Sequence, residues 1–247
     1  MSDHKPDTPE ALEEALAAAF ETDPWINRHH SPIRVSVEGD RVILEGRVEH
    51  VAAIRRALAL AEQLAAPHRA VEDRLRRRPI EPMGDRELRD EAVNAFTGEP
   101  VFAGYTLRTH TGDKTETIHD GGPDGGRILV AIEDPGTITL TGSVGSLSHR
   151  RLAEALMWWI RGCETVDNCL EIDPPEEDSD DEINDAVRIV LEKDPMVHAD
   201  LLRIGTAAGI VHLDGTVATE EEKRFAVLDC FSVPGVYDVL DRLQVNR

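Results

Sequence analysis

One short pattern occurs three times in this chain of 247 residues and limits the possible folds more than any other feature. Leu44-Glu-Gly46-Arg-Val48 recurs as Leu140-Thr-Gly142-Ser-Val144 and as Leu213-Asp-Gly215-Thr-Val217. A valine follows each glycine at nearly constant spacing; these valines are Val71, Val166 and Val239. An acidic residue followed by proline precedes each pattern, at Asp23, Glu99 and Asp194. Marks that recur in the same order predict three copies of one structural unit.

Hydrophobic periodicity predicts the order helix, strand, strand, helix, strand within each copy. Each first helix has apolar residues four positions apart: Leu12, Leu16 and Phe20; Leu88, Ala92 and Phe96; Ile183, Val187 and Leu191. Alternation in Ile33, Val35 and Val37 indicates a strand. We therefore predict an α/β chain of the α+β two-layer type, with three αββαβ repeats, each having two helices on a three-stranded mixed sheet.

The predicted domains are residues 8–78, 85–173 and 180–247. The distance from the proline to the motif glycine is longest in the middle repeat, which indicates an insertion near residues 108–127. Because this segment is rich in Gly, Thr and Asp, we expect an exposed loop or a mobile lid.

The three copies resemble the BON domain (bacterial OsmY and nodulation), whose mark is V-x-L-x-G-x-V. This mark is matched by Val42 to Val48, Ile138 to Val144 and Val211 to Val217. The resemblance implies a small sandwich of two helices on a three-stranded sheet and no enzyme activity. It also implies association with phospholipid, a role in osmotic or envelope stress, or potassium binding.

The formal net charge of −21 argues against nucleic acid as a partner, because that affinity depends on Lys and Arg. Cys163, Cys169 and Cys230 have no CxxC spacing, so we expect no cysteine-based zinc site. The polar N-terminus and the short apolar stretches predict no signal peptide and no transmembrane segment. We therefore expect a cytoplasmic protein.

Three aromatic residues in the second helices are candidates for a binding surface. Trp158 and Phe231 occupy the position that Glu62 holds in the first repeat, and Trp159 follows Trp158. We hypothesise that Trp158 and Phe231 lie at a junction between the second and third repeats, or in a site for a protein partner. Packing within each repeat is the alternative, since aromatic residues commonly fill cores.

Basic residues cluster near the end of the first repeat, at Arg69, Arg74, Arg76, Arg77 and Arg78. Arg76, Arg77 and Arg78 are candidates for contact with anionic phospholipid. The alternative is a solvated strand end whose charges pair with acidic neighbours.

The inserted segment also has a group of polar residues that suggests a metal site: His110, Asp113, Glu116, His119, Asp120 and Asp124. Their spacing matches no known metal-binding loop, so we predict no metal and no cofactor. The chain has no catalytic motif, and we assign no catalytic residue. We read Gly46, Gly142 and Gly215 as structural residues that allow close backbone approach rather than as ligand contacts.

These observations predict a non-enzymatic binding or scaffolding protein, linked by the family resemblance to osmotic or envelope stress. Peripheral association with anionic phospholipid is one alternative, and a cytoplasmic potassium-binding osmotic sensor is another. The sequence identifies neither the partner nor the oligomeric state.

Overall fold

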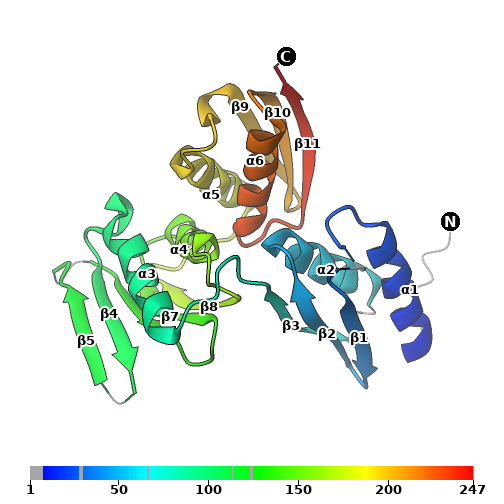
Figure 1. Ribbon diagram of the computed structural model, residues 1–247, viewed down its shortest axis with the longest axis horizontal. Helices are drawn as coiled ribbons and strands as arrows, with labels where there is room; N and C mark the ends of the chain where they lie inside the picture. The colour runs from blue at the N-terminus through cyan, green and yellow to red at the C-terminus, as the bar shows by residue number, and fades with distance from the viewer. Residues whose placement is uncertain (1–7, 28–29, 66, 113, 123–124, 247) are drawn as a thin grey trace. The chain divides into compact units, whose positions relative to one another are not determined.

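The computed structural model describes residues 8–27, 30–65, 67–112, 114–122 and 125–246. The chain divides into two compact units, Met1–Arg78 and Pro79–Arg247 (Figure 1). The first unit contains the first repeat. The second unit contains the other two repeats.

The first repeat has two helices and a three-stranded sheet in the predicted order. Its elements are α1 (Pro9–Thr22), β1 (Ile33–Glu38), β2 (Arg41–Val48), α2 (Val51–Leu64) and β3 (Ala70–Arg77). The sheet order is β1-β2-β3, with β1 antiparallel and β3 parallel to β2. Parallel strands need a crossover connection, and α2 provides it.

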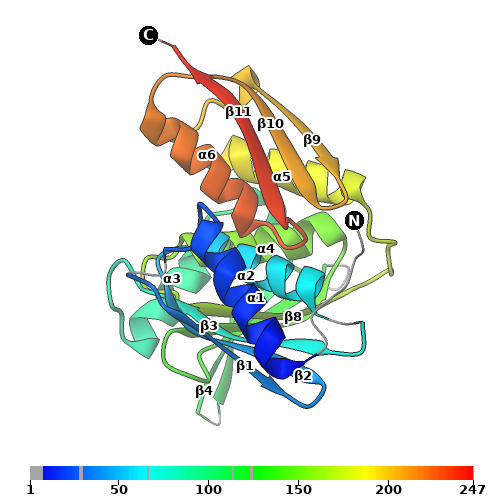
Figure 2. The ribbon, with the colours of Figure 1, turned by 90° about the vertical axis from the view of Figure 1, so that its right-hand side faces the viewer.

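The third repeat has the same topology. Its elements are α5 (Asp180–Lys193), the short helix η2 (Ala199–Leu201), β9 (Leu202–Ala207), β10 (Ile210–Val217), α6 (Glu220–Ser232) and β11 (Asp238–Val245). The sheet order is β11-β10-β9, again with one parallel and one antiparallel pair. Figure 2 shows both helices on one side of this sheet.

The middle repeat has a larger sheet. Its elements are α3 (Asp85–Thr97), the short helix η1 (Pro100–Phe102), β4 (Thr106–Thr111), β5 (Lys114–His119), β6 (Arg127–Ala131), β7 (Thr137–Val144), α4 (Leu147–Trp159) and β8 (Thr165–Ile172). The five strands have the order β5-β4-β6-β7-β8. The three-stranded core of the other repeats corresponds to β6, β7 and β8, and β4 and β5 extend it beyond β6.

The segment expected as an exposed loop therefore forms mainly a β-hairpin. β4 pairs parallel with β6, and Leu107 lies opposite Ile128 on the core side of the sheet. The threonines that suggested a loop are β-branched, and such residues favour strands. Gly112, Asp120, Gly121 and Gly122, which favoured a loop in the sequence, lie outside the two strands.

Each first helix buries the predicted apolar stripe. Leu12, Leu16 and Phe20 are fully buried in α1, and the corresponding residues of α3 and α5 are buried as well. The second helices share a small residue at one equivalent position, Ala57, Ala153 and Ala226, and these alanines have no exposed surface. Thr8 caps the N-terminus of α1, since its side-chain oxygen accepts a hydrogen bond from the Ala11 backbone N–H at 3.2 Å.

The acid-proline dipeptides form the same turn after each first helix. In each, a carboxylate oxygen accepts a hydrogen bond from the backbone N–H two residues later. The three bonds are Trp25 to Asp23 at 2.9 Å, Val101 to Glu99 at 3.0 Å and Met196 to Asp194 at 2.8 Å. The acidic residue thus stabilises a turn that the proline helps to begin.

At each motif glycine, the backbone at the start of the sheet's first strand comes very close to the glycine Cα. Gly46, Gly142 and Gly215 have φ of +155°, +123° and +142°. A Cβ at these positions would lie 2.6, 2.0 and 2.3 Å from the carbonyl oxygens of Pro32, Arg127 and Leu201. A side chain would therefore collide with backbone, which accounts for the recurrence of glycine.

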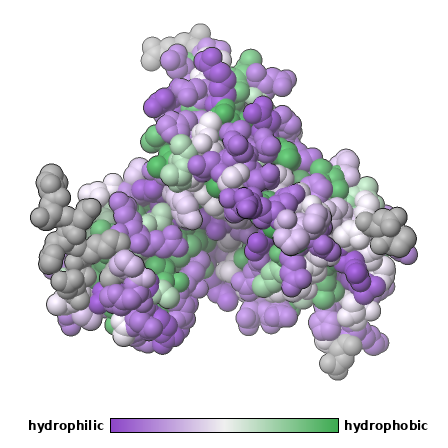
Figure 3. Space-filling model, turned by 180° about the vertical axis from the view of Figure 1, so that it is seen from behind, coloured by the Kyte–Doolittle hydropathy of each residue, from purple (hydrophilic) through white to green (hydrophobic). Residues whose placement is uncertain are grey.

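On the face in Figure 3, hydrophilic residues predominate and hydrophobic residues form small separate areas. Single exposed apolar residues such as Ile80 and Met196 are common on protein surfaces. Among the described residues, no helix has both the length and the apolar character needed to cross a bilayer.

Candidate functional site

Helix α4 is buried around most of its circumference. Its buried residues are Leu147, Arg151, Leu152, Ala153, Glu154, Ala155, Leu156, Met157 and Trp158. One side packs on β7 and β8 of its own repeat, and others contact α3, α5 and α6. A helix buried on all sides belongs to the interior of an assembly of elements. The helical layers of the second and third repeats therefore pack against each other.

The repeats differ in burial at the helix position where the sequence places Trp158 and Phe231. This difference agrees with the packing of the second and third repeats against each other. Glu62 is exposed in α2, whereas Trp158 is 5% exposed and Phe231 is fully buried. The indole nitrogen of Trp158 donates to Glu154 of its own helix at 3.3 Å. The indole nitrogen of Trp159 instead donates across the junction to Asp229 Oδ1 in α6, at 3.0 Å.

Asp229 is a buried carboxyl group, with 6% of its surface exposed. Burial, together with the neighbouring carboxyl of Asp194, raises the pKa of Asp229 to about 9. The hydrogen bond from Trp159 lowers the pKa of Asp229, but its effect is smaller than the effects of burial and of Asp194. Asp229 is therefore protonated at neutral pH.

Arg151 makes a second connection across the junction. Its side chain is 4% exposed, and its Nη2 lies 2.6 Å from Asp178 Oδ1 in the segment between β8 and α5. Its Nε donates to the carbonyl oxygen of Pro234 at 2.9 Å, after α6. Arg151 thus connects α4 to the segment that precedes α5 and to the segment that follows α6.

The acidic residue of the middle repeat's turn takes part in a third connection. Glu99 Oε1 lies 2.7 Å from Lys193 Nζ at the end of α5. In the first repeat, the corresponding Asp23 pairs instead with Arg56 of the same repeat at 2.9 Å. In the third repeat, Asp194 faces Asp229. The acidic residue of the turn therefore has a different neighbour in each repeat. In the first repeat it is an arginine of the same repeat, in the second it is a lysine of the third repeat, and in the third it is the protonated Asp229.

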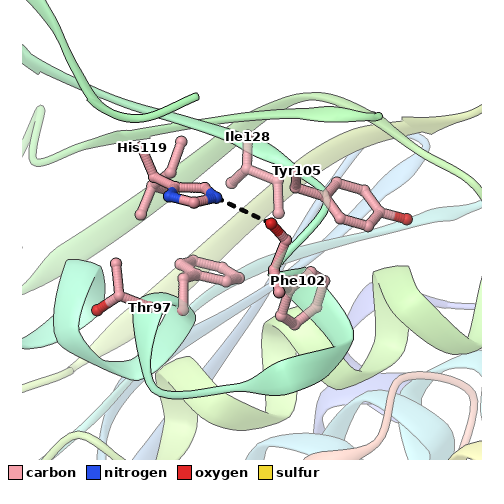
Figure 4. A pocket seen from close by; sticks show the side chains of 8 residues that line it. Thr97, Phe102, Tyr105, His119 and Ile128 are labelled. Carbon is pink, nitrogen blue, oxygen red and sulfur yellow. Dashed lines mark hydrogen bonds between the residues drawn. The ribbon is translucent and has the colours of Figure 1, made fainter. Parts of the chain in front are cut away.

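The hairpin of the middle repeat forms one wall of a small pocket (Figure 4). The cavity measures about 100 Å³. Its lining comes from α3, η1, the following loop and three strands: Phe96, Thr97, Phe102, Ala103, Tyr105, Leu107, His119 and Ile128. His119 of β5 donates from Nε2 to the carbonyl oxygen of Ala103 at 2.8 Å, the dashed line in Figure 4. This contact ties the end of the hairpin to the loop after η1.

An aromatic cluster supports the floor of this pocket. Phe102 makes edge-to-face contacts with Phe96 at 5.0 Å and with Tyr105 at 5.4 Å between ring centroids. The Tyr105 hydroxyl accepts from the Gly145 backbone N–H at 3.0 Å and lies 2.7 Å from His149 Nδ1. Burial lowers the pKa of His149, which favours the neutral ring, and Nδ1 of a neutral ring can accept a hydrogen bond from the Tyr105 hydroxyl.

The arginine cluster at the end of the first repeat is only partly a surface feature. Arg77 is 7% exposed, because it points to the same side of β3 as the buried Leu75. The sequence hypothesis of three adjacent lipid-contacting arginines therefore needs correction, since successive residues of a strand face opposite sides. Arg78 is exposed, and its guanidinium donates to the carbonyl oxygen of His30.

Strand register reveals a different arrangement of charges on the helix-free face of this sheet. Its members are Arg34, Arg41, Arg47, Arg74 and Arg76, with Glu38, Glu45 and Glu72. Arg41 lies 3.1 Å from Glu72, and Arg34 lies 3.3 Å from Glu45. This face has more positive than negative side chains, but the charges are interleaved.

The polar residues of the inserted segment are not gathered around one point. His110 contacts Thr115, and His119 bonds to Ala103. Within the described part of the chain, no group of three His, Cys, Asp or Glu residues could hold a metal ion. Asp113 and Asp124 lie outside the described residues.

Sequence reasoning missed the residues that connect the two repeats most directly. Asp229 is a charged residue inside an otherwise apolar stretch of its helix, and that exception was a usable signal. Arg151 gave no such signal, because it directly follows the polar residues Ser148, His149 and Arg150. Lys193 gave no such signal, because lysine is ordinary near the end of a helix. Glu99 was recognised as part of the recurrent acid-proline mark, but that mark did not indicate a contact with another repeat.

Fold and site together define a class of protein built from tandem αββαβ modules, two of them joined through their helices. The BON domain family matches residues 8–79, 114–174 and 179–247. The chain therefore belongs to the BON domain family. In the middle repeat the match begins at β5, because the hairpin separates α3 from the rest of the module.

Two solved structures of Chlamydia trachomatis CdsD are similar to this chain. One is described as the C-terminal domain of this structural protein of the type III secretion system; it has 14% identity and a TM-score of 0.25, over 96% of this chain and 98% of that one. The other CdsD structure has 14% identity and a TM-score of 0.23, over 95% and 90%. A search of curated proteins finds no match.

Proposed function

We propose that this protein is a non-enzymatic scaffold in which the second and third repeats act as one rigid body that binds a protein partner. The observation that carries this proposal is the burial of α4 on nearly all sides between its own sheet and α5 and α6. Because the helical layers face each other, the sheet faces and edges of these repeats are available for a partner.

The polar groups at the junction favour a structural over a catalytic role. Arg151, Asp229 and Lys193 each have a partner in the other repeat, at 2.7 to 3.0 Å. A catalytic group needs access to a substrate, whereas the side chains of Arg151 and Asp229 are almost completely buried. We extend the proposal to the cytoplasm, since the three cysteines are free thiols.

The test compares capture of partners by the full chain and by Arg151→Ala. Both are immobilised and exposed to lysate of the protein's own organism at low and high salt. Captured proteins are identified, and binding is then measured with purified components. We expect a partner that binds the unaltered chain at least tenfold more tightly than Arg151→Ala. Equal affinity for both chains, or turnover of a small substrate, contradicts the proposal.

Peripheral binding to anionic phospholipid is a second candidate, favoured by the arginines on the helix-free face of the first sheet. A surface with excess positive charge is attracted to anionic lipid headgroups. Vesicle flotation with phosphatidylglycerol at low salt tests it, using Arg34→Ser combined with Arg74→Ser. Arg86→Ser and Arg161→Ser together serve as the control, because both residues are exposed and lie in the second unit. Loss of flotation only in the first variant supports this candidate, and no flotation of the unaltered chain rejects it.

The potassium-sensor alternative and the link to osmotic or envelope stress stay predictions from the family. A ligand of the native state raises apparent stability. Potassium chloride should therefore raise the unfolding temperature more than sodium chloride does if the protein is a potassium sensor. Equal shifts with both salts reject that role.

A further inference from the structure

The pocket under the β4–β5 hairpin is a separate feature from the junction between repeats. Leu107 and His119 of its lining belong to strands that the first and third repeats lack. The inserted hairpin thus creates a cavity that the basic αββαβ module does not need for its fold.

The walls of the pocket are apolar and well ordered by their surroundings. The hydrocarbon and aromatic side chains that form most of it are almost completely buried; their exposed fractions are 2% for Phe96, 4% for Phe102, 8% for Tyr105, 4% for Leu107 and 1% for Ile128. Mutual edge-to-face contacts fix the three rings. A pocket with walls held in this way is formed before a ligand enters.

The polar side chains of the lining, Thr97, Tyr105 and His119, each already make a hydrogen bond inside the protein. The Thr97 hydroxyl donates to the carbonyl oxygen of Val93 at 3.0 Å. The Tyr105 hydroxyl is engaged with Gly145 and His149. His119 uses Nε2 for the carbonyl oxygen of Ala103. A charged or strongly polar ligand would lose its hydration without gaining equivalent hydrogen bonds.

The size of the cavity restricts the ligand further. Apolar cavities of about 150 Å³ lined by Leu, Ile and Phe stay dry and bind benzene or xenon. A cavity of about 100 Å³ fits a smaller group, such as a few carbons at the end of an alkyl chain.

We propose that this pocket binds the compact hydrocarbon end of a neutral ligand, either a small free molecule or the tip of an acyl chain. The hairpin supplies one wall, and the bond from His119 to Ala103 holds that wall in position. The polar part of such a ligand stays in solvent. This site is independent of the scaffold role, because the junction residues do not line it.

The test titrates the full chain with straight-chain alcohols from ethanol to hexanol, while NMR follows the methyl groups of Leu107 and Ile128. We expect saturable shifts of both residues. Affinity should rise about fourfold for each added methylene until the cavity is full and then level off. Flotation with phosphatidylcholine vesicles forms a second arm. Association with vesicles identifies an acyl chain as the source, and binding of alcohols alone identifies a small molecule.

Three variants make the test specific. Ala103→Leu fills the pocket from its exposed rim and should abolish the shifts. Ile128→Val enlarges the cavity and should move the plateau to a longer chain. Ile118→Ala removes an exposed apolar residue of β5 that does not line the pocket and should change nothing. No saturable shift with any alcohol, or the same shifts in Ala103→Leu and the unaltered chain, overturns the proposal.

Discussion

The indole nitrogen of Trp159 donates a hydrogen bond of 3.0 Å to Oδ1 of Asp229, joining α4 of the second repeat to α6 of the third. The acceptor is a carboxyl group whose pKa of about 9 keeps it protonated at neutral pH. The junction thus contains a polar contact without a net charge. An ionised carboxylate at this depth would be far more costly to bury.

The stability of the second unit should fall as pH rises above neutrality. Folding raises the pKa of Asp229 from an ordinary value of 3.8 to about 9, so the folded state holds a proton that the unfolded state releases. Its stabilising effect is complete below the unfolded pKa and is lost as pH rises through the folded pKa. The expected slope from this group is about 1.4 kcal/mol per pH unit. Urea unfolding between pH 7 and 8.5 measures it.

Asp229→Asn is the matched variant for this pH dependence. Asparagine has nearly the same shape, cannot ionise, can accept from Trp159 and can donate to Asp194. We expect this variant to be more stable than the unaltered chain at pH 8, with a difference that shrinks at pH 7. The same pH slope in both proteins would show that Asp229 is not the group responsible.

Arg151→Ala should destabilise the second unit by about 2 kcal/mol, because it leaves the carbonyl of Pro234 without its donor and removes a buried side chain. Arg161→Ala is the control. Arg161 pairs with Glu81 at 3.4 Å, but both side chains are 61% exposed, so its loss should cost less than about 0.5 kcal/mol. Equal effects in chemical denaturation would refute the role of Arg151.

Trp159→Phe should weaken the junction by about 1 kcal/mol through loss of the indole donor. Hydrogen exchange is the appropriate measurement, because it reports on separate parts of the chain. We expect faster exchange in the last turn of α6. Trp158→Phe is the comparison, since the Trp158 indole bonds within α4. The interpretation fails if Trp158→Phe loosens α6 more than Trp159→Phe does.

Gly142→Ala should cost about 3 kcal/mol or more, because the new Cβ would lie 2.0 Å from the carbonyl oxygen of Arg127. Gly205→Ala is a suitable control, since a Cβ there meets nothing within 4 Å. It should change stability by less than about 1 kcal/mol. Thermal unfolding compares the two, and similar losses would contradict a steric role for the motif glycine.

Much of the fold could be predicted from the sequence because the chain repeats its own signals. Three features recur in every repeat: the motif glycine, an apolar stripe such as Leu12, Leu16 and Phe20, and a small buried residue such as Ala57. A pattern that occurs three times in the same order seldom arises by chance. The hairpin occurs once and offered no internal comparison. Its threonines are compatible with either a loop or a strand. The segment is a strand because β4 pairs with β6, and this pairing cannot be read from the local sequence.

The candidate site was less predictable because it depends on which repeats meet. The exposed Glu62 and the buried aromatics Trp158 and Phe231 at the same position did indicate a difference in environment. The sequence could not indicate that Trp159 would reach Asp229, because that contact requires the relative orientation of two repeats. The burial of Arg77 was missed because a run of arginines in the sequence splits between two faces of a strand.

We propose that the second and third repeats form one rigid body. Residual dipolar couplings of backbone amides in β6 to β8 and in β9 to β11, measured on the full chain in solution, test it most directly. A single alignment tensor should fit both sheets, and Arg151→Ala should make the two tensors differ. Two different tensors in the unaltered chain would contradict the claim.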